Sequence, residues 1–181
     1  AVGRLTHQKG FDFLIDAFCQ IADAHLGWDL VILGEGEERQ KLLAKIAYKG
    51  LLSRVFLPGT AGNIASWYER ADIFVMSSRF EGFPCTLVEA MAHKLAVVSF
   101  DCDTGPRDII RHEIDGYLVP SGDVTALAAK LDQLVGDEII MKRYAELAVE
   151  VRERFSMERI LKEWDNVIRD TKNILIVKKA R

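Results

Sequence analysis

The sequence lacks several features that point to common functional classes. It has three cysteines among 181 residues, and no two of them have the C-x-x-C spacing of a redox or zinc motif. Its four histidines are scattered, with none spaced from another as metal ligands are. No apolar run reaches the roughly 18 residues needed to span a bilayer, and the first residues do not read as a secretory signal. We therefore expect a cytoplasmic, reducing compartment, with no structural metal and no transmembrane segment.

The chain also has no large excess of positive or negative charge. The chain carries 24 basic and 27 acidic residues, for a formal net charge of −3. Binding to the phosphate backbone of DNA or RNA requires a strong positive field, so we expect no nucleic-acid partner. A small phosphorylated ligand needs only two or three cations and stays possible. With 49% apolar residues the chain can form a substantial core, and its length fits one domain.

Short apolar runs alternate with helical patterns over most of the chain. The runs are continuous rather than alternating, which is typical of parallel strands buried on both faces. Strands and helices in this order predict an α/β fold, with a Rossmann-like parallel sheet of about six strands flanked by helices. The strand candidates are Ala1–Leu5, Trp28–Leu33, Arg54–Leu57, Asp72–Met76, Leu95–Phe100 and Gly116–Val119.

Helical patterns lie between these strands and make up the C-terminal part of the chain. We assign residues 1–172 to the Rossmann-like domain and residues 173–181 to a tail. Asp123 and Ser156 are the candidate N-caps of the helices that follow them. The expected helices are Gly10–His25, Glu37–Tyr48, Ile64–Arg70, Thr86–His93, a short one from Gly105, Asp123–Val135, Asp137–Phe155 and one that begins at Ser156.

Residues that follow the strands are the first candidates for a site, because ligands of open parallel sheets bind outside the carboxyl ends of the strands. Arg4 lies at the end of the first strand, and Lys9 lies at the start of the first helix. Two cations beside the positive end of a helix can bind an anion, although taken alone the segment reads as an ordinary solvated loop. Gly34-Glu35-Gly36 reads as a tight turn, since Arg39 stands where the dinucleotide fingerprint needs its third glycine.

The densest segment runs from Ser77 to Ala92. Pro84 suits the first turn of a helix, and the amides of Cys85, Thr86 and Leu87 then lack intrahelical acceptors and can face an anion. Glu89 lies one turn into that helix, where neutral hydroxyl groups such as a ribose diol suit it better than a phosphate. Glu81, before the turn, suits a second set of hydroxyls. The alternative is a packed, capped helix with two surface carboxylates.

A last polar segment follows the strand expected at Leu95–Phe100. Asp101 and Asp103 form an Asp-x-Asp pair just before Gly105-Pro106, which opens a short helix. The pair either caps backbone amides or binds a cation. Because two carboxylates at this spacing are frequent in surface loops, we favour capping.

Taken together, these segments resemble the group 1 glycosyltransferases, the large retaining family with the GT-B fold. The resemblance rests on GRLTHQKGFDFLIDAF, VILGEGEE, VFLPG, ADIFVMSSRFEGFPCTLVEAMA, GPRDII and DGYLVP, and covers the chain from Gly3 to about Trp164. Glu81 and Glu89, with seven residues between them, match the paired-glutamate motif of that family. The resemblance implies the C-terminal, donor-binding half of a two-domain enzyme, without the N-terminal half that holds the acceptor.

The resemblance also implies roles for individual residues. Arg4 and Lys9 would hold the donor diphosphate and Glu89 the ribose hydroxyls, while Glu81 and the backbone from Phe83 to Leu87 would position the sugar and the β-phosphate. Arg4, Lys9 and Glu81 are thus the expected catalytic residues. The expected donor-binding residues are Gly3, Leu57, Gly59, Phe83, Pro84, Cys85, Thr86, Leu87 and Glu89, with Leu57 to Gly59 as the wall beside the base.

The implied activity is transfer of a hexose from a nucleoside-diphosphate sugar, with a UDP-sugar as the commonest donor in the family, to a glycan or lipid-linked acceptor in polysaccharide biosynthesis. No metal or other cofactor is required. The chain alone is expected to be inactive, and the enzyme to be cytoplasmic or peripheral at the inner membrane face through its other half. Two alternatives stay open: a non-catalytic module that binds a nucleotide or nucleotide sugar, and a GT-B relative with other chemistry, such as a phosphorylase or an epimerase.

Overall fold

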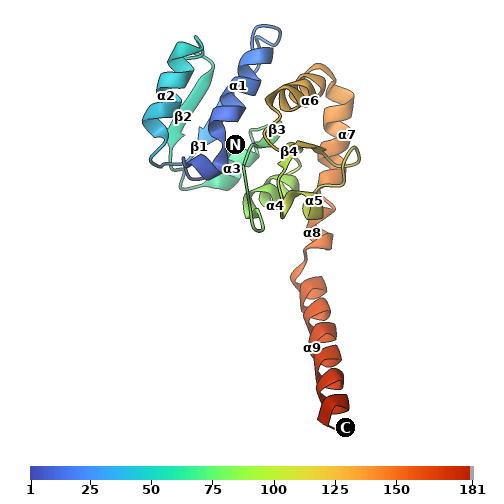
Figure 1. Ribbon diagram of the computed structural model, residues 1–181. Helices are drawn as coiled ribbons and strands as arrows, with labels where there is room; N and C mark the ends of the chain where they lie inside the picture. Colours follow the sequence, from blue (N-terminus) through green and yellow to red (C-terminus); the bar gives the residue numbers. More distant parts are fainter. Residues whose placement is uncertain (180–181) are drawn as a thin grey trace. The chain divides into compact units, whose positions relative to one another are not determined.

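The computed structural model describes the backbone of residues 1–179 and the side chains of residues 1–169 (Figure 1). The chain divides into two compact units, residues 1–149 and residues 150–181. The first unit holds all the strands that the described residues form and every residue of the expected site. Each unit is therefore described separately.

Parallel strands form the centre of the first unit, in two groups. Strands β1 (Leu30–Leu33) and β2 (Val55–Gly59) pair with each other. Strands β3 (Ile73–Met76), β4 (Ala96–Asp101) and β5 (Tyr117–Pro120) pair in that order. Every pair is parallel, as the continuous apolar runs predict, and helices flank the strands. The α/β class and the parallel, Rossmann-like arrangement are thereby confirmed.

The sixth expected strand, Ala1–Leu5, is reduced to a single bridge. Val2 forms an isolated parallel bridge with Leu33, and the Gly3 amide donates to the Leu33 carbonyl at 2.9 Å. The amide of Leu5 donates instead to the carbonyl of Glu35 at 2.8 Å, beyond the end of β1. The segment thus lies alongside β1 but leaves its ladder after Gly3, and this departure makes it a loop at the carboxyl edge of the strands.

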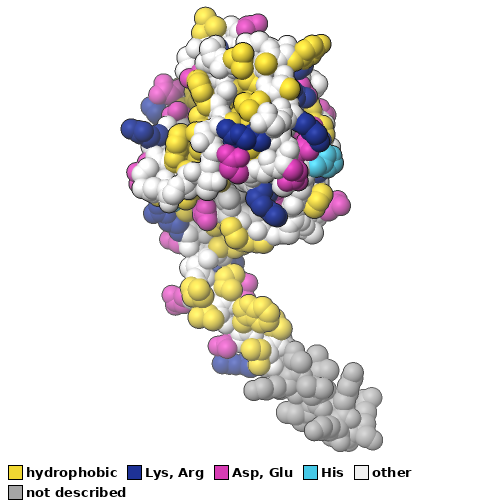
Figure 2. Space-filling model, turned by 90° about the vertical axis from the view of Figure 1, so that its left-hand side faces the viewer, with side chains coloured by type: hydrophobic (Ala, Val, Ile, Leu, Met, Phe, Trp, Pro, Cys, Tyr) yellow, Lys and Arg dark blue, Asp and Glu magenta, His cyan; other side chains and the backbone are white. Residues whose placement is uncertain are grey.

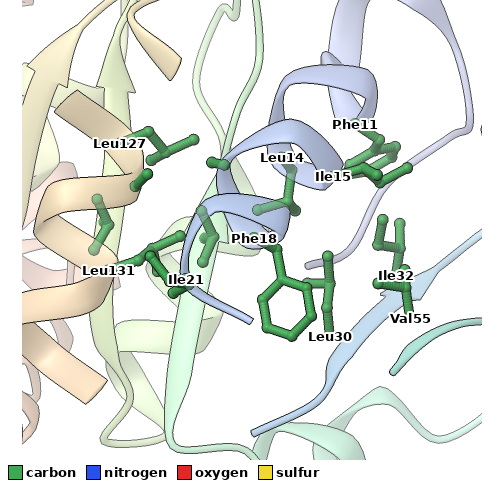
Figure 3. Close-up of a cluster of buried hydrophobic side chains, with 14 of the residues drawn as sticks. Phe11, Leu14, Ile15, Phe18, Ile21, Leu30, Ile32, Val55, Leu127 and Leu131 are labelled. Atoms are coloured by element: carbon green, nitrogen blue, oxygen red, sulfur yellow. The ribbon is translucent and has the colours of Figure 1, made fainter. Parts of the chain in front are cut away.

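The packing of helix α1 (Phe11–Ile21) fixes the position of the loop that leads into it. Phe18 and Ile21 point from α1 into a cluster of buried apolar side chains that includes Leu30 of β1 and Leu131 of α6 (Val124–Gly136) (Figure 3). The apolar positions of α1 recur at helical spacing and are buried. Helix α1 is therefore fixed between β1 and α6, and this packing fixes the loop that enters it.

The other helices of the first unit agree closely with expectation. Asp123 is the N-cap of α6, since its carboxylate accepts from the Ala126 amide at 2.9 Å. The 3-10 turn His7–Lys9 precedes α1. The remaining helices are α2 (Arg39–Tyr48), α3 (Ile64–Tyr68), α4 (Cys85–Ala92), α5 (Pro106–Ile109) and α7 (Glu138–Ala148).

The second unit contains α8 (Val151–Arg154) and α9 (Met157–Lys179). The single helix expected over Asp137–Phe155 is wrong, because the chain ends α7 at Ala148 and begins a new turn at Val151. Ser156 does cap α9, accepting from the Arg159 amide at 3.3 Å. Residues 173–179 of the expected tail belong to α9, and residues 180–181 lie outside the described residues.

Apolar side chains lie exposed along α9. Leu161 is 58% and Trp164 61% exposed, and hydrophobic side chains are visible along the described part of this helix in Figure 2. Charged residues separate them, and none of the helices in the described residues is long and apolar enough to cross a membrane.

Candidate functional site

The loops at the carboxyl edge of the strands pack backbone against backbone. Gly34 has a φ of +142°, and a Cβ there would lie 1.9 Å from the carbonyl oxygen of Gly3. Gly10 has a φ of +61°, and a Cβ there would lie 2.1 Å from the carbonyl oxygen of Ser77. No side chain fits in either place, so only glycine allows these loops to approach so closely. The tight turn expected at Gly34 to Gly36 falls instead at residues 37–38, directly before α2. The two close approaches, of Gly34 to Gly3 and of Gly10 to Ser77, bring the first three site loops together.

Lys9 and Glu81 meet across two of these loops. The Lys9 ammonium donates to Oε1 of Glu81 at 2.6 Å, and the Ser78 hydroxyl donates to the same oxygen at 2.6 Å. The Glu81 side chain is only 7% exposed and that of Lys9 18%. Within the part of the chain that the structure describes, no donor reaches the other carboxylate oxygen, Oε2, of Glu81. The pair therefore keeps one carboxylate oxygen and two ammonium hydrogens for a ligand.

Arg4 differs from Lys9 in its surroundings. Its side chain is exposed, and among the described residues no group accepts a hydrogen bond from its guanidinium. It follows directly after Gly3, which hydrogen-bonds to the end of β1. The structure thus places both expected cations on one loop at the carboxyl edge, but only Lys9 is held by a partner.

The amino end of α4 provides the backbone donors. Pro84 precedes the helix as its N-cap, and its carbonyl accepts from the Leu87 amide at 3.0 Å. The expectation that the Leu87 amide lacks an acceptor is therefore wrong, because the first turn is tight enough for this i to i+3 bond. The amides of Cys85 and Thr86 donate to no other group in the described residues. These two amides are the donors that the helix offers to an anion.

Glu89 lies further along α4 and is exposed at one side. Its Oε2 accepts from the hydroxyl of Tyr68 at 3.2 Å, and the same hydroxyl lies 3.4 Å from the Thr86 carbonyl. Tyr68, on α3, is 3% exposed. Burial raises the pKa of its phenol, and the Glu89 carboxylate raises it further, so the hydroxyl keeps its proton and donates. Tyr68 is not among the site residues expected from the sequence, because nothing in its local pattern separates it from a core aromatic.

The turn after β1 also contacts β2. Arg39, the residue in place of the third glycine of a dinucleotide fingerprint, donates to Glu35 at 2.9 Å and to the carbonyl of Leu57 at 2.8 Å. The amide of Gly34 donates to the carbonyl of Gly59 at 2.9 Å. Leu57 and Gly59 thus lie at the carboxyl edge next to this turn, as expected for a wall of the site.

The Asp101 segment differs from expectation. Asp101 accepts from Nε of Arg107 at 2.9 Å rather than capping α5, which has no side-chain cap. The hydroxyl of Thr104 donates to the carbonyl of Glu81, and a Cβ on Gly105 would lie 2.6 Å from the carbonyl oxygen of Gly82. This segment therefore packs against the backbone of the turn that contains Glu81 and Gly82. No group of three or more metal-ligating side chains occurs among the described residues.

A cavity of about 730 Å³ lies at the opposite edge of the strands. It is lined by the starts of strands and by helix residues, among them Leu30, Ile73, Leu95 and Val135. The side chains of Lys9, Glu81 and Glu89 do not line it. Of the residues described for the candidate site, Tyr68 alone lines this cavity. The charged groups of the site lie in the open loops at the carboxyl edge.

Comparison with known proteins places this chain in a family. Residues 1–137 match the family model described as glycosyl transferases group 1. The chain belongs to that family. It is 36% identical over 168 residues to the amylovoran biosynthesis glycosyltransferase AmsD of Erwinia amylovora, which covers 93% of this chain and 47% of AmsD. An N-acetylgalactosaminyltransferase of Campylobacter jejuni, named for an undecaprenol-linked glycan, is 31% identical over 95% of this chain and 48% of its own length.

Solved structures of glycosyltransferases share the fold. The S. aureus TarM structure, determined with a ligand set that includes UDP, superposes with a TM-score of 0.87 at 31% identity, over 91% of this chain and 34% of TarM. The C-terminal domain of the group 1 glycosyl transferase LpcC from Francisella tularensis gives a TM-score of 0.78 at 29% identity, over 85% of this chain and 83% of that domain. This group 1 chain thus spans about half the length of AmsD and has the fold of one domain of such enzymes.

Proposed function

We propose that the chain is the nucleotide-sugar-binding half of a retaining glycosyltransferase, which moves a hexose from a nucleoside-diphosphate sugar to a glycan or lipid-linked acceptor. The observation that carries this proposal is the meeting of Lys9 and Glu81 at 2.6 Å at the carboxyl edge of a parallel sheet. A cation and a carboxylate with unused capacity, side by side, suit a ligand that has a phosphate next to a polyol. A nucleotide sugar is such a ligand.

The phosphate end of this ligand would be bound by four groups. The Lys9 ammonium and the exposed Arg4 guanidinium provide positive charge, and the amides of Cys85 and Thr86 add donors at the positive end of α4. As the glycosidic bond breaks, negative charge grows on the leaving diphosphate. Donors already oriented toward that charge stabilise the transition state more than the bound substrate. This is electrostatic catalysis by groups of the chain itself.

The sugar end would be bound by the carboxylates. Glu81 has one free oxygen, Oε2, for a hydroxyl of the transferred hexose. Glu89, oriented by Tyr68, has one oxygen for the ribose. A same-face reaction guided by the leaving phosphate agrees with this arrangement, because Glu81 is already paired with Lys9 and is not placed as a free nucleophile. The S. aureus relative solved with UDP supports a uridine nucleotide as the first donor to test.

Calorimetry tests the proposal directly. UDP, GDP and ADP are titrated into the full chain, and we expect at least one to bind in a one-to-one complex. Lys9→Ala should weaken the binding by at least about tenfold, since a charge-assisted hydrogen bond contributes roughly 1.5–3 kcal/mol and each 1.4 kcal/mol is a factor of ten. Lys41→Ala, which removes a lysine that is 75% exposed and pairs only locally with Glu38, is the matched control and should leave binding unchanged. Absence of binding by every nucleotide at millimolar concentration would contradict the proposal.

A further inference from the structure

The loops that carry Lys9 and Glu81 are joined by bonds that involve neither charged group. The backbone amide of Arg79 donates to the carbonyl of Gln8 at 2.8 Å, and the side-chain amide of Gln8 donates to the carbonyl of Phe80 at 3.1 Å. The Ser77 hydroxyl donates to the carbonyl of Lys9 itself at 3.1 Å. The backbones on either side of the Lys9–Glu81 contact are thus fixed to each other.

The Arg79 side chain adds a second connection between the same loops. Its two terminal nitrogens donate to the two oxygens of Asp12 at 2.9 and 2.7 Å, and Nη1 also donates to the carbonyl of His7 at 2.7 Å. The guanidinium lies over the ring of Phe13, 4.0 Å from its centroid. One planar group therefore holds both the 3-10 turn that contains Lys9 and the first turn of α1. The backbone of Arg79 is itself two residues from Glu81.

We propose that Arg79 and Asp12 are positioning residues for the diphosphate site: they hold the backbone of Lys9 so that its ammonium lies at Glu81. This proposal rests on the proposed function, because it assigns a purpose to the Lys9 position. A lysine side chain is long and flexible, so its anchor decides where its charge can be used. A two-pronged guanidinium–carboxylate pair fixes direction as well as distance, which a single ion pair does not.

An isosteric change at Asp12 separates positioning from simple electrostatics. Asp12→Asn removes a negative charge close to a proposed anion site, so electrostatics alone predicts tighter binding of an anion. Loss of the two-pronged pair frees the Lys9 loop, so positioning predicts weaker binding. The two explanations therefore predict changes of opposite sign for the same variant.

The probe is inorganic diphosphate, titrated into the full chain by calorimetry. We expect Asp12→Asn to weaken its binding by at least about threefold, within the usual range of coupling between residues in one network. Arg79→Lys keeps the charge but loses the fork, and should weaken binding to a similar extent. Asp29→Asn is the matched control: Asp29 accepts from Nε of Arg54 at 3.0 Å at the opposite edge of the strands, so this change should leave binding unaltered.

Hydrogen exchange of the amides of Lys9 and Gly10 gives a readout that needs no ligand. Both amides bond within the loop, to Thr6 and His7, and should exchange faster in Asp12→Asn than in Asp29→Asn. Unchanged exchange, or diphosphate binding that is equal or tighter in Asp12→Asn, overturns the positioning role while leaving the proposed function intact. If the unaltered chain binds no diphosphate at all, the anion site itself is contradicted.

Discussion

Glu81 and Glu89 are alike in sequence but differ in their neighbours. Glu81 is almost fully buried and accepts from Lys9 and Ser78, whereas Glu89 is exposed and accepts from the Tyr68 phenol. A buried carboxylate beside an ammonium is suited to the part of a ligand next to the phosphate. An exposed carboxylate oriented by a neutral donor is suited to a part further away.

This difference predicts unequal effects of two alanine variants. Glu89→Ala should weaken binding of the bare nucleotide more than Glu81→Ala, and the gap should narrow for the nucleotide sugar. The reason is that both ligands contain the ribose but only one contains the transferred sugar. Each lost charged hydrogen bond corresponds to roughly 1.5–3 kcal/mol. Calorimetry with UDP and a UDP-sugar measures both; equal effects of the two variants on both ligands would rule out this division of roles.

Gly105 allows a second prediction for a single residue. With φ of +91°, its Cβ would lie 2.5 Å from Cδ of Pro84, so Gly105→Ala should push the Asp101 segment away from the Glu81 turn. We expect a loss of stability of about 1–3 kcal/mol in urea unfolding, together with weaker nucleotide binding. Gly122→Ala is the matched control, because φ there is +78° but nothing lies within 4 Å of the added Cβ. If both variants lose the same stability, backbone strain and not the contact with Pro84 is the cause.

Between elements, the Arg79–Asp12 pair makes stability depend on pH. Burial alone would raise the pKa of Asp12, but the hydrogen bonds and charge of Arg79 outweigh it and hold the pKa below its ordinary value of 3.8. The pair therefore stabilises the fold fully above about pH 4, and this contribution is lost as the pH falls through the lowered pKa. Asp12 is 38% exposed, so solvent screening limits the contribution to about 1 kcal/mol.

Unfolding at several pH values measures this contribution. The stability difference between the unaltered chain and Asp12→Asn should be constant from pH 7 to 5 and shrink below pH 4. The Asp29→Asn difference serves as the control for general acid effects. A difference for Asp12→Asn that persists unchanged at pH 2 would show that its carboxylate charge is not what stabilises the loops.

The sequence predicted most elements because their causes are local. Strand β4 is apolar except for Ser99 and Asp101, and all but its last residue, Asp101, are buried. The N-caps at Asp123 and Ser156 follow from side chains that accept from amides three residues away. The strand predicted at Ala1–Leu5 was less accurate. The segment leaves the sheet because Leu5 bonds to the carbonyl of Glu35, thirty residues later.

The contacts within the site could not be read from the sequence for the same reason. The sequence and its family resemblance identified Lys9, Glu81 and Glu89, but not that Lys9 and Glu81 touch across 72 positions. Nor did they indicate Arg79, whose partner Asp12 is 67 positions away. Asp101 was assigned to capping, whereas a cation six residues later takes its carboxylate. Such pairings are decided by how the loops pack, after the strands have formed.

For the whole molecule, we predict binding without transfer. The chain should bind a nucleoside diphosphate with a dissociation constant of about 10⁻⁴ to 10⁻³ M, because the site is open on one side. It should transfer no sugar, with or without divalent metal, since holding the acceptor in place can supply roughly 7–11 kcal/mol of the lowered barrier. A coupled assay that monitors the release of UDP from a UDP-sugar measures turnover. Transfer at a rate usual for such enzymes would show that this chain alone holds the acceptor.

In an enzyme that contains this chain together with an acceptor-binding half, Arg4→Ala and Lys9→Ala should lower turnover more than they weaken donor binding. Negative charge develops on the leaving diphosphate only as the bond breaks, so its stabilisation appears in kcat. Steady-state kinetics with a purified acceptor tests this. An increase in KM alone would make the two residues donor ligands without a catalytic role.

The backbone contacts at Gly10, Gly34 and Gly105 also limit which positions of this domain can change in evolution. None of these positions has room for an added carbon atom, so each glycine must be kept for the loops to stay in contact. If the proposed donor site is correct, a change of donor is left to side chains beside the fixed loops, such as Phe83 before α4 and Thr86 in its first turn. A library that varies those positions and spares the glycines should keep most of its members folded, and one that varies the glycines should not.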